Sequence, residues 1–131
     1  STLFPYTTLF RSGPYLQYMY ARMCSIFKKA GVVTSNVDFS LLETDAEKNL
    51  LLLLASFPEL VQRSAEEYKP NVIARFALNL AKQFSSYYHQ SKIYDENNKE
   101  LSCARLVLLQ ALQQALKNAL ILLGIETPES M

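Results

Sequence analysis

The chain has 131 residues, 50% of them hydrophobic, with 13 Lys+Arg against 12 Asp+Glu and only three glycines. This length and composition are typical of one folded domain, and they exclude both a disordered tail and a pair of full-sized domains. The longest unbroken apolar run, Leu50–Ala55, is far shorter than the roughly 20 residues that a membrane-spanning helix needs. Because the net charge is only +1, any binding of nucleic acid must depend on where the charges lie.

Residues 1–12 differ in composition from the rest of the chain. They hold two phenylalanines, a proline, two adjacent threonines and a single charge, Arg11, without the basic start or cleavage site of a secretory signal. The run TLFPYTTLFRS over residues 2–12 resembles the translation of a short-read sequencing adapter. We therefore expect residues 1–12 to be an artefactual or disordered arm, and residues 13–131 to be the C-terminal piece of a longer protein. A natural N-terminal strand or arm is the alternative.

The first predicted helix runs from Tyr15 to the residue before Gly31. Pro14 suits the first turn of a helix, and glycine favours the left-handed conformation after a helix end. Residues 31–43 then indicate a loop with a short turn of its own. Next, Thr44 and Glu47 have the spacing of a capping box, which predicts the start of a second helix. Pro58 predicts a break or bend in it, before a further helical stretch over residues 59–68.

Two more helices are predicted in the second half of the chain. After Lys69-Pro70, apolar residues recur at steps of one, three or four from Asn71 to Tyr88, which indicates a long amphipathic helix. A polar, turn-rich stretch over residues 90–100 follows, and the last helix runs near residues 102–123 until Gly124. No alternating strand pattern follows residue 12, so the sequence predicts an all-α fold, an antiparallel helical bundle of four to five helices.

The residue inventory argues against several kinds of site. Three scattered glycines cannot form a phosphate-binding loop, and Cys24, His89 and Cys103 are too far apart in the chain to predict a metal site. We expect both cysteines to be reduced thiols of a cytoplasmic protein, with no disulfide. Sequence distance does not exclude a Cys–His catalytic pair, but nothing supports one, and His89 is better explained as a residue at a helix C-terminus.

One face of the first helix is a candidate RNA-binding surface. At about 100° per residue, Tyr15, Tyr18, Arg22 and Lys29 gather on the face opposite the apolar residues Leu16, Met23 and Phe27. Tyrosine rings beside a guanidinium can stack on unpaired bases, and arginine can bind a base edge or a phosphate. The alternative is that the two tyrosines only pack against a neighbouring helix.

Three segments carry a resemblance to a known family. The run GPYLQYMYARMCSIFKKAG over residues 13–31 resembles the junction helix of arginyl-tRNA synthetases, where the catalytic domain meets the anticodon-binding domain. Residues 70–88 are similar to the family's helix with spaced Leu-Ala and a terminal Phe-x-x-Phe/Tyr-Tyr. Residues 104–131, with the ending LLGIETPESM, resemble the family's C-terminus. The chain is identified as a helical anticodon-binding domain of the DALR type.

The resemblance implies a set of binding residues. In this family two tyrosines and an arginine of the junction helix, a tyrosine of the Leu-Ala helix and the C-terminal methionine surround the anticodon loop. At the matching positions this chain has Tyr15, Tyr18, Arg22, Tyr88 and Met131. Tyr87 adjoins Tyr88, and a shift of one residue would rotate the choice by about 100°.

The resemblance also implies what the complete protein does. It would be a cytoplasmic ligase, expected to be monomeric, that joins arginine to its tRNA using ATP with Mg. ATP and Mg would bind in a catalytic domain of the same polypeptide. The signature motifs of that domain do not occur in this sequence. This piece would bind the anticodon stem-loop of arginine tRNA, without a cofactor, a metal or catalytic residues of its own. Two alternatives are a helical protein-interaction module and the anticodon domain of another class I synthetase, such as the cysteine enzyme.

Overall fold

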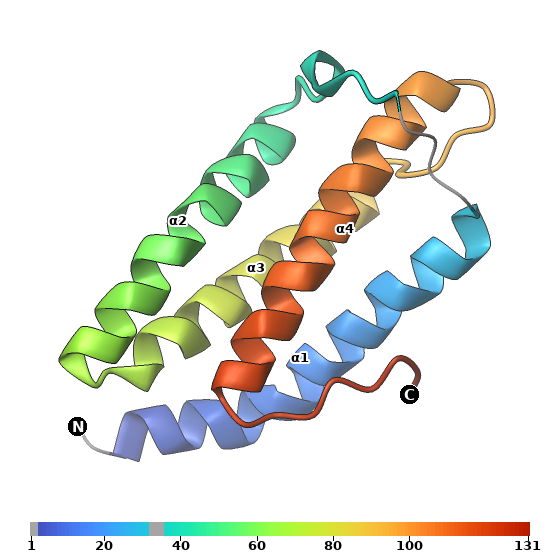
Figure 1. Ribbon diagram of the computed structural model, residues 1–131. Helices are drawn as coiled ribbons and strands as arrows, with labels where there is room; N and C mark the ends of the chain where they lie inside the picture. The colour runs from blue at the N-terminus through green and yellow to red at the C-terminus, as the bar shows by residue number, and fades with distance from the viewer. Residues whose placement is uncertain (1–2, 32–35) are drawn as a thin grey trace.

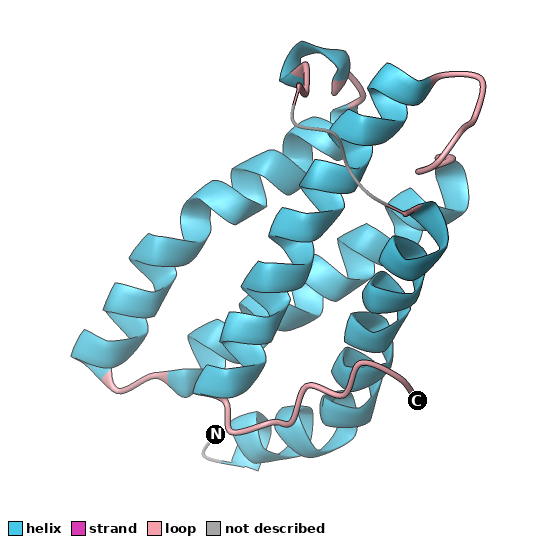
Figure 2. Cartoon of the chain, turned by 45° about the vertical axis from the view of Figure 1, so that its right-hand side comes forward, coloured by secondary structure: helices cyan, strands magenta, loops and turns pink. Residues whose placement is uncertain are grey.

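A computed structural model describes residues 3–31 and 36–131, with side chains from residue 12 onward. Its four α-helices are α1 (Leu3–Ala30), α2 (Asp45–Glu67), α3 (Pro70–Gln90) and α4 (Lys99–Leu122), which run alternately up and down (Figure 1). The helices α3 and α4 contact each other and both remaining helices, whereas α1 and α2 do not touch within the described ranges. The all-α antiparallel bundle is confirmed, with four helices and no strand in those residues (Figure 2).

The helix ends follow the local sequence signals. A short 3-10 helix, η1 (Phe39–Leu41), is the predicted turn in the connection from α1 to α2. At the start of α2, the Thr44 hydroxyl accepts a hydrogen bond from the Glu47 backbone N–H at 3.2 Å, and the Glu47 carboxylate accepts one from the Thr44 N–H at 3.2 Å. Gly31 and Gly124 have φ of +83° and +73°, the left-handed conformation expected after a helix. The capping box and both glycine ends are confirmed.

Of the break or bend predicted at Pro58, the break is wrong, because α2 continues through this residue. Phe57 stacks on Phe76 of α3 with ring centroids 4.6 Å apart, and Leu60 and Val61 also pack against the core. Side chains on both sides of Pro58 are therefore held against the core. This packing offsets the cost of a proline inside a helix, which is about 3 kcal/mol.

Two helix starts also differ from the prediction. The first helix begins at Leu3 rather than after Pro14, which lies inside α1. Its helical backbone over residues 3–12 does not bear on their origin, so their assignment as an artefactual arm stays a prediction. The last helix begins at Lys99, because the Asn98 side chain accepts a hydrogen bond from the Leu101 N–H at 3.3 Å and caps the first turn.

The core lies where α3 and α4 meet the other helices. Its largest fully buried side chains include Phe84, Leu80, Leu112 and Leu116. No helix of the described chain is both long enough and apolar enough to span a membrane.

The segment after α4 turns back and runs beside α1 in both views (Figures 1 and 2). The Ile125 N–H donates to the Leu120 carbonyl at 2.8 Å, and the Gln17 side chain of α1 donates to the Glu126 carbonyl at 3.1 Å. The first bond turns the chain at the end of α4, and the second holds residue 126 beside α1.

Candidate nucleic-acid interface

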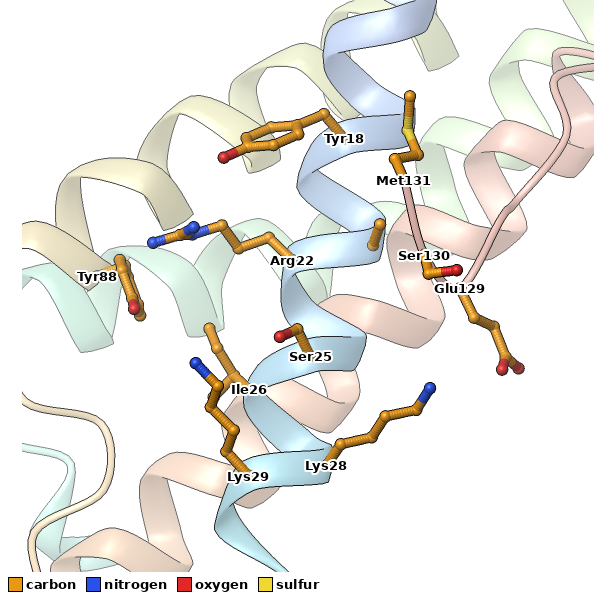
Figure 3. Close-up of a pocket in the computed structure, with 11 residues that line it drawn as sticks. Tyr18, Arg22, Ser25, Ile26, Lys28, Lys29, Tyr88, Glu129, Ser130 and Met131 are labelled. Atoms are coloured by element: carbon orange, nitrogen blue, oxygen red, sulfur yellow. The ribbon is translucent and has the colours of Figure 1, made fainter.

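A cavity of about 330 Å³ lies between α1, the end of α3 and the C-terminal segment (Figure 3). Four of the five binding residues predicted from the sequence line it: Tyr18, Arg22, Tyr88 and Met131. They come from three elements that are distant in the sequence. The fold therefore brings these four together.

Burial of one face of α1 directs Tyr18 and Arg22 toward the cavity. Leu16, Met19 and Met23 are at most 4% exposed and fix this helix on the core. Tyr18 is 49% exposed and Arg22 is also exposed, and the two lie one helical turn apart. The amphipathic pattern of the first helix therefore predicted correctly that Tyr18 and Arg22 face solvent.

Arg22 and Tyr88 are in direct contact across the cavity. The Arg22 Cζ lies 4.8 Å from the centroid of the Tyr88 ring, a cation–π distance, and Figure 3 shows the guanidinium reaching toward Tyr88. Tyr88 is also 6.1 Å from Phe84 between ring centroids, in a tilted arrangement. The cation and the aromatic ring thus form one preassembled surface, with Tyr18 on the neighbouring turn of α1.

Burial distinguishes the two adjacent tyrosines of α3. Tyr87 is 2% exposed, and its hydroxyl donates to the Glu47 carboxylate at 2.7 Å in the interior. Tyr88 is half-buried and lines the cavity. Tyr88 is therefore the tyrosine of α3 that a ligand in the cavity would meet.

Glu47 is the centre of a buried network that sequence reasoning recognised only as a helix cap. This carboxylate has no exposed surface and accepts hydrogen bonds from Tyr87, from the Thr44 hydroxyl at 2.8 Å and from the Arg105 Nε at 2.9 Å. Burial alone would raise the pKa of Glu47, but the hydrogen bonds from Tyr87, Thr44 and Arg105 outweigh it and lower the pKa. Burial and the bond to Glu47 raise the pKa of Tyr87. No sequence signal links Glu47 to Tyr87 or Arg105, because they meet only through tertiary packing.

Met131 reaches the cavity through the C-terminal segment that is bonded to Gln17. Its side chain is 72% exposed, and Glu129 and Ser130 line the cavity beside it. The charged lining residues are Arg22, Lys28, Lys29 and Glu129. Among the lining side chains, three cations face one carboxylate, so these side chains carry a net positive charge, although the whole chain is nearly neutral.

Tyr15 is the predicted binding residue that the structure does not bring to the cavity. It is half-buried and packs against the core, so the alternative of helix packing describes it better. Lys29, singled out on the same helix face, does line the cavity. His89 has its Nδ1 2.7 Å from the Ser85 carbonyl in the last turns of α3, as expected for a residue at a helix C-terminus.

Other candidate chemistry does not come together in the structure. Within residues 3–31 and 36–131, no group of three or more His, Cys, Asp or Glu residues is placed to hold a metal ion. Cys24 is buried, and its Sγ accepts a hydrogen bond from the Gln113 Nε2 at 2.9 Å. Cys24 forms no disulfide with Cys103. The positive, aromatic cavity is therefore the candidate site, and its composition suits an unpaired nucleotide.

Comparison with known proteins gives the family. Residues 16–131 match the model of the DALR anticodon binding domain. The chain belongs to this family. The solved structure of the Thermus thermophilus arginyl-tRNA synthetase is similar to this DALR domain with a TM-score of 0.76 and 39% identity, over 90% of this chain and 21% of that one.

The curated relatives of this DALR domain are arginine-tRNA ligases. The enzyme of Clostridioides difficile is 40% identical over 121 residues, which is 92% of this chain and 21% of the relative. That of Levilactobacillus brevis is 42% identical over 120 residues, again 92% of this chain and 21% of the relative. The chain thus spans about a fifth of the length of these relatives. The resemblance to the anticodon-binding domain of arginyl-tRNA synthetases is confirmed.

Proposed function

We propose that this domain binds the anticodon loop of arginine tRNA as part of a larger arginine-tRNA ligase. The observation that carries the proposal is the cavity in which Tyr18, Arg22, Tyr88 and Met131 meet, in a chain that matches arginine-tRNA ligases. The complete enzyme would join arginine to its tRNA in the cytoplasm, as a monomer, using ATP with Mg in a catalytic domain in cis. That domain lies outside this chain.

The lining residues suggest how an unpaired base would be held. Base stacking on an aromatic ring contributes about 1–3 kcal/mol per base, and the exposed Tyr18 ring offers such a surface. The Arg22 guanidinium lies over the Tyr88 ring, and its N–H groups can donate to a base edge or a phosphate. Lys28 and Lys29 add positive charge to the cavity lining, where it can attract the phosphates of the RNA.

The near-neutral net charge also makes a prediction about affinity. Because few cations are available to release counterions from the RNA, recognition depends on a small number of stacking and polar contacts. We expect weak binding by the isolated chain that decreases further with added salt.

The test is a titration of the 131-residue chain into a fluorescently labelled anticodon stem-loop of arginine tRNA at low salt, read by anisotropy. We expect Tyr18→Ala and Arg22→Ala each to weaken binding by about 1–3 kcal/mol. Tyr68→Ala is the matched control, because Tyr68 is 90% exposed at the C-cap of α2, beyond the opposite end of α3 from Tyr88. Equal affinity for stem-loops of unrelated tRNAs, unchanged by either substitution, would refute the proposed site. If a protein partner instead lost its binding through these substitutions, and RNA did not compete with that partner, the surface would be a protein-docking surface.

A further inference from the structure

A second cavity, of about 470 Å³, opens beside the first where α1 and α3 end. Its walls come from the last turns of these two helices and from residues 91–94 of the loop that leads to α4. Ile26, Lys29 and Tyr88 line both cavities. The two cavities are therefore neighbouring parts of one surface.

Three aromatic rings line the second cavity. Tyr94 is 39% exposed, and His89 meets Tyr88 in a T-shaped contact with ring centroids 5.9 Å apart. The aliphatic side chains of Ile26 and Ile93 complete the apolar wall. Flat aromatic groups beside aliphatic ones are typical of surfaces on which unpaired bases stack.

The charged groups of the second cavity favour an anionic ligand. Lys29 and Lys92 line it, and its described lining residues include no carboxylate. Asp95 approaches Lys92 from the same loop, but the Nζ to Oδ1 distance is 3.9 Å and the Lys92 side chain is 73% exposed. Because this ion pair is long and exposed to solvent, it is weak, and Lys92 stays available to bind a phosphate.

The loop that forms the outer wall is fixed by bonds to α4. The Arg105 Nη1 donates to the Lys92 carbonyl at 2.9 Å, and the Ser102 hydroxyl accepts from the Asp95 N–H at 2.7 Å. Ile93 is 4% exposed and anchors the loop on the core. The wall that carries Tyr94 is therefore formed before any ligand binds, which lowers the entropy cost of binding.

We propose that the second cavity binds a further unpaired nucleotide of the same RNA loop that occupies the first. Its base would stack against Tyr94, and its phosphate would lie near Lys29, which both cavities share. This inference rests on the proposed function, since the same RNA must enter both cavities. It makes Tyr94 and Lys92 additional binding residues.

The experiment combines protein variants with single abasic substitutions in the loop of the labelled arginine anticodon stem-loop. We expect Tyr94→Ala to weaken binding about tenfold and Tyr94→Phe, which keeps the ring, to bind like the unchanged protein. When the base that stacks on Tyr94 is removed from the RNA loop, Tyr94→Ala should no longer weaken binding. Removal of a different base should abolish the effect of Arg22→Ala. Tyr68→Ala again serves as the control, and Lys48→Glu on α2 is the charge control for Lys92→Glu, which should weaken binding.

The outcomes separate this inference from the proposed function. If Arg22→Ala weakens binding while Tyr94→Ala and Lys92→Glu behave like their controls, the second nucleotide site is overturned and the proposed function stands. The second nucleotide site is also overturned if removal of one and the same base abolishes the effects of both Arg22→Ala and Tyr94→Ala. If no substitution in either cavity changes the affinity, the proposed function fails together with the inference.

Discussion

At the scale of single residues, Tyr87 and Tyr88 show that adjacent residues of one helix can have different roles. A step of about 100° directs the Tyr87 hydroxyl to the buried Glu47 carboxylate and the Tyr88 ring to the cavity shared with Arg22. One ring contributes to folding and the other presents a binding surface. Periodicity alone could not assign these parts, because both residues lie near the edge of the apolar face.

This division predicts two separable effects. Tyr87→Phe removes a hydrogen bond to a buried carboxylate, so we expect it to lower the free energy of unfolding by about 1–3 kcal/mol and to leave RNA affinity nearly unchanged. Tyr88→Ala should weaken binding of the stem-loop by a similar free energy with a smaller loss of stability. Urea denaturation and fluorescence anisotropy on both variants measure the two quantities. The assignment would be wrong if Tyr87→Phe lowered the affinity more than Tyr88→Ala did.

At the scale of helices, the start of α2 and the C-terminal ends of α1 and α4 were predictable from local sequence, whereas the continuity of α2 was not. Thr44 with Glu47, and glycines at positions 31 and 124, act through the backbone within a few residues. Pro58 also carries a local signal, but the stacking of Phe57 on Phe76 of α3 overrides it. A tertiary contact of this kind cannot be seen in a sequence pattern, and the same limit explains why the partners of Glu47 were missed.

Because packing offsets the cost of Pro58, removing this proline should stabilise the protein. In Pro58→Ala the new backbone N–H can donate to the Leu54 carbonyl, and we expect a gain of about 1–3 kcal/mol in the free energy of unfolding. Pro70→Ala is the control, since Pro70 lies in the first turn of α3, where proline is favourable. Denaturation curves of both variants test this, and an unchanged or reduced stability of Pro58→Ala would contradict the explanation.

At the scale of the molecule, the Glu47 network joins three helices and the loop of the second cavity. Glu47 of α2 accepts from Tyr87 of α3 and from Arg105 of α4, and Arg105 also holds the Lys92 carbonyl. These bonds cross the bundle close to the end that carries the candidate site. An antiparallel bundle of four to five helices could be predicted from apolar periodicity, but this link between core and site depends on residues 40 and 58 positions apart in the chain.

The network makes stability depend on pH in a defined direction. The hydrogen bonds lower the pKa of Glu47 in the folded state below its ordinary value of 4.5, so its contribution is complete above that pH and is lost as the pH falls below it. Glu47→Gln should lower the free energy of unfolding by about 3 kcal/mol at pH 7, since Arg105 and Tyr87 lose a buried anionic partner. Urea denaturation from pH 7 to pH 3 should show the difference between the two proteins shrinking on acidification. Glu59→Gln, at an exposed position of α2, should instead follow the parent curve throughout. Parallel curves for Glu47→Gln and the parent would mean that Glu47 is not the carboxylate that couples folding to pH.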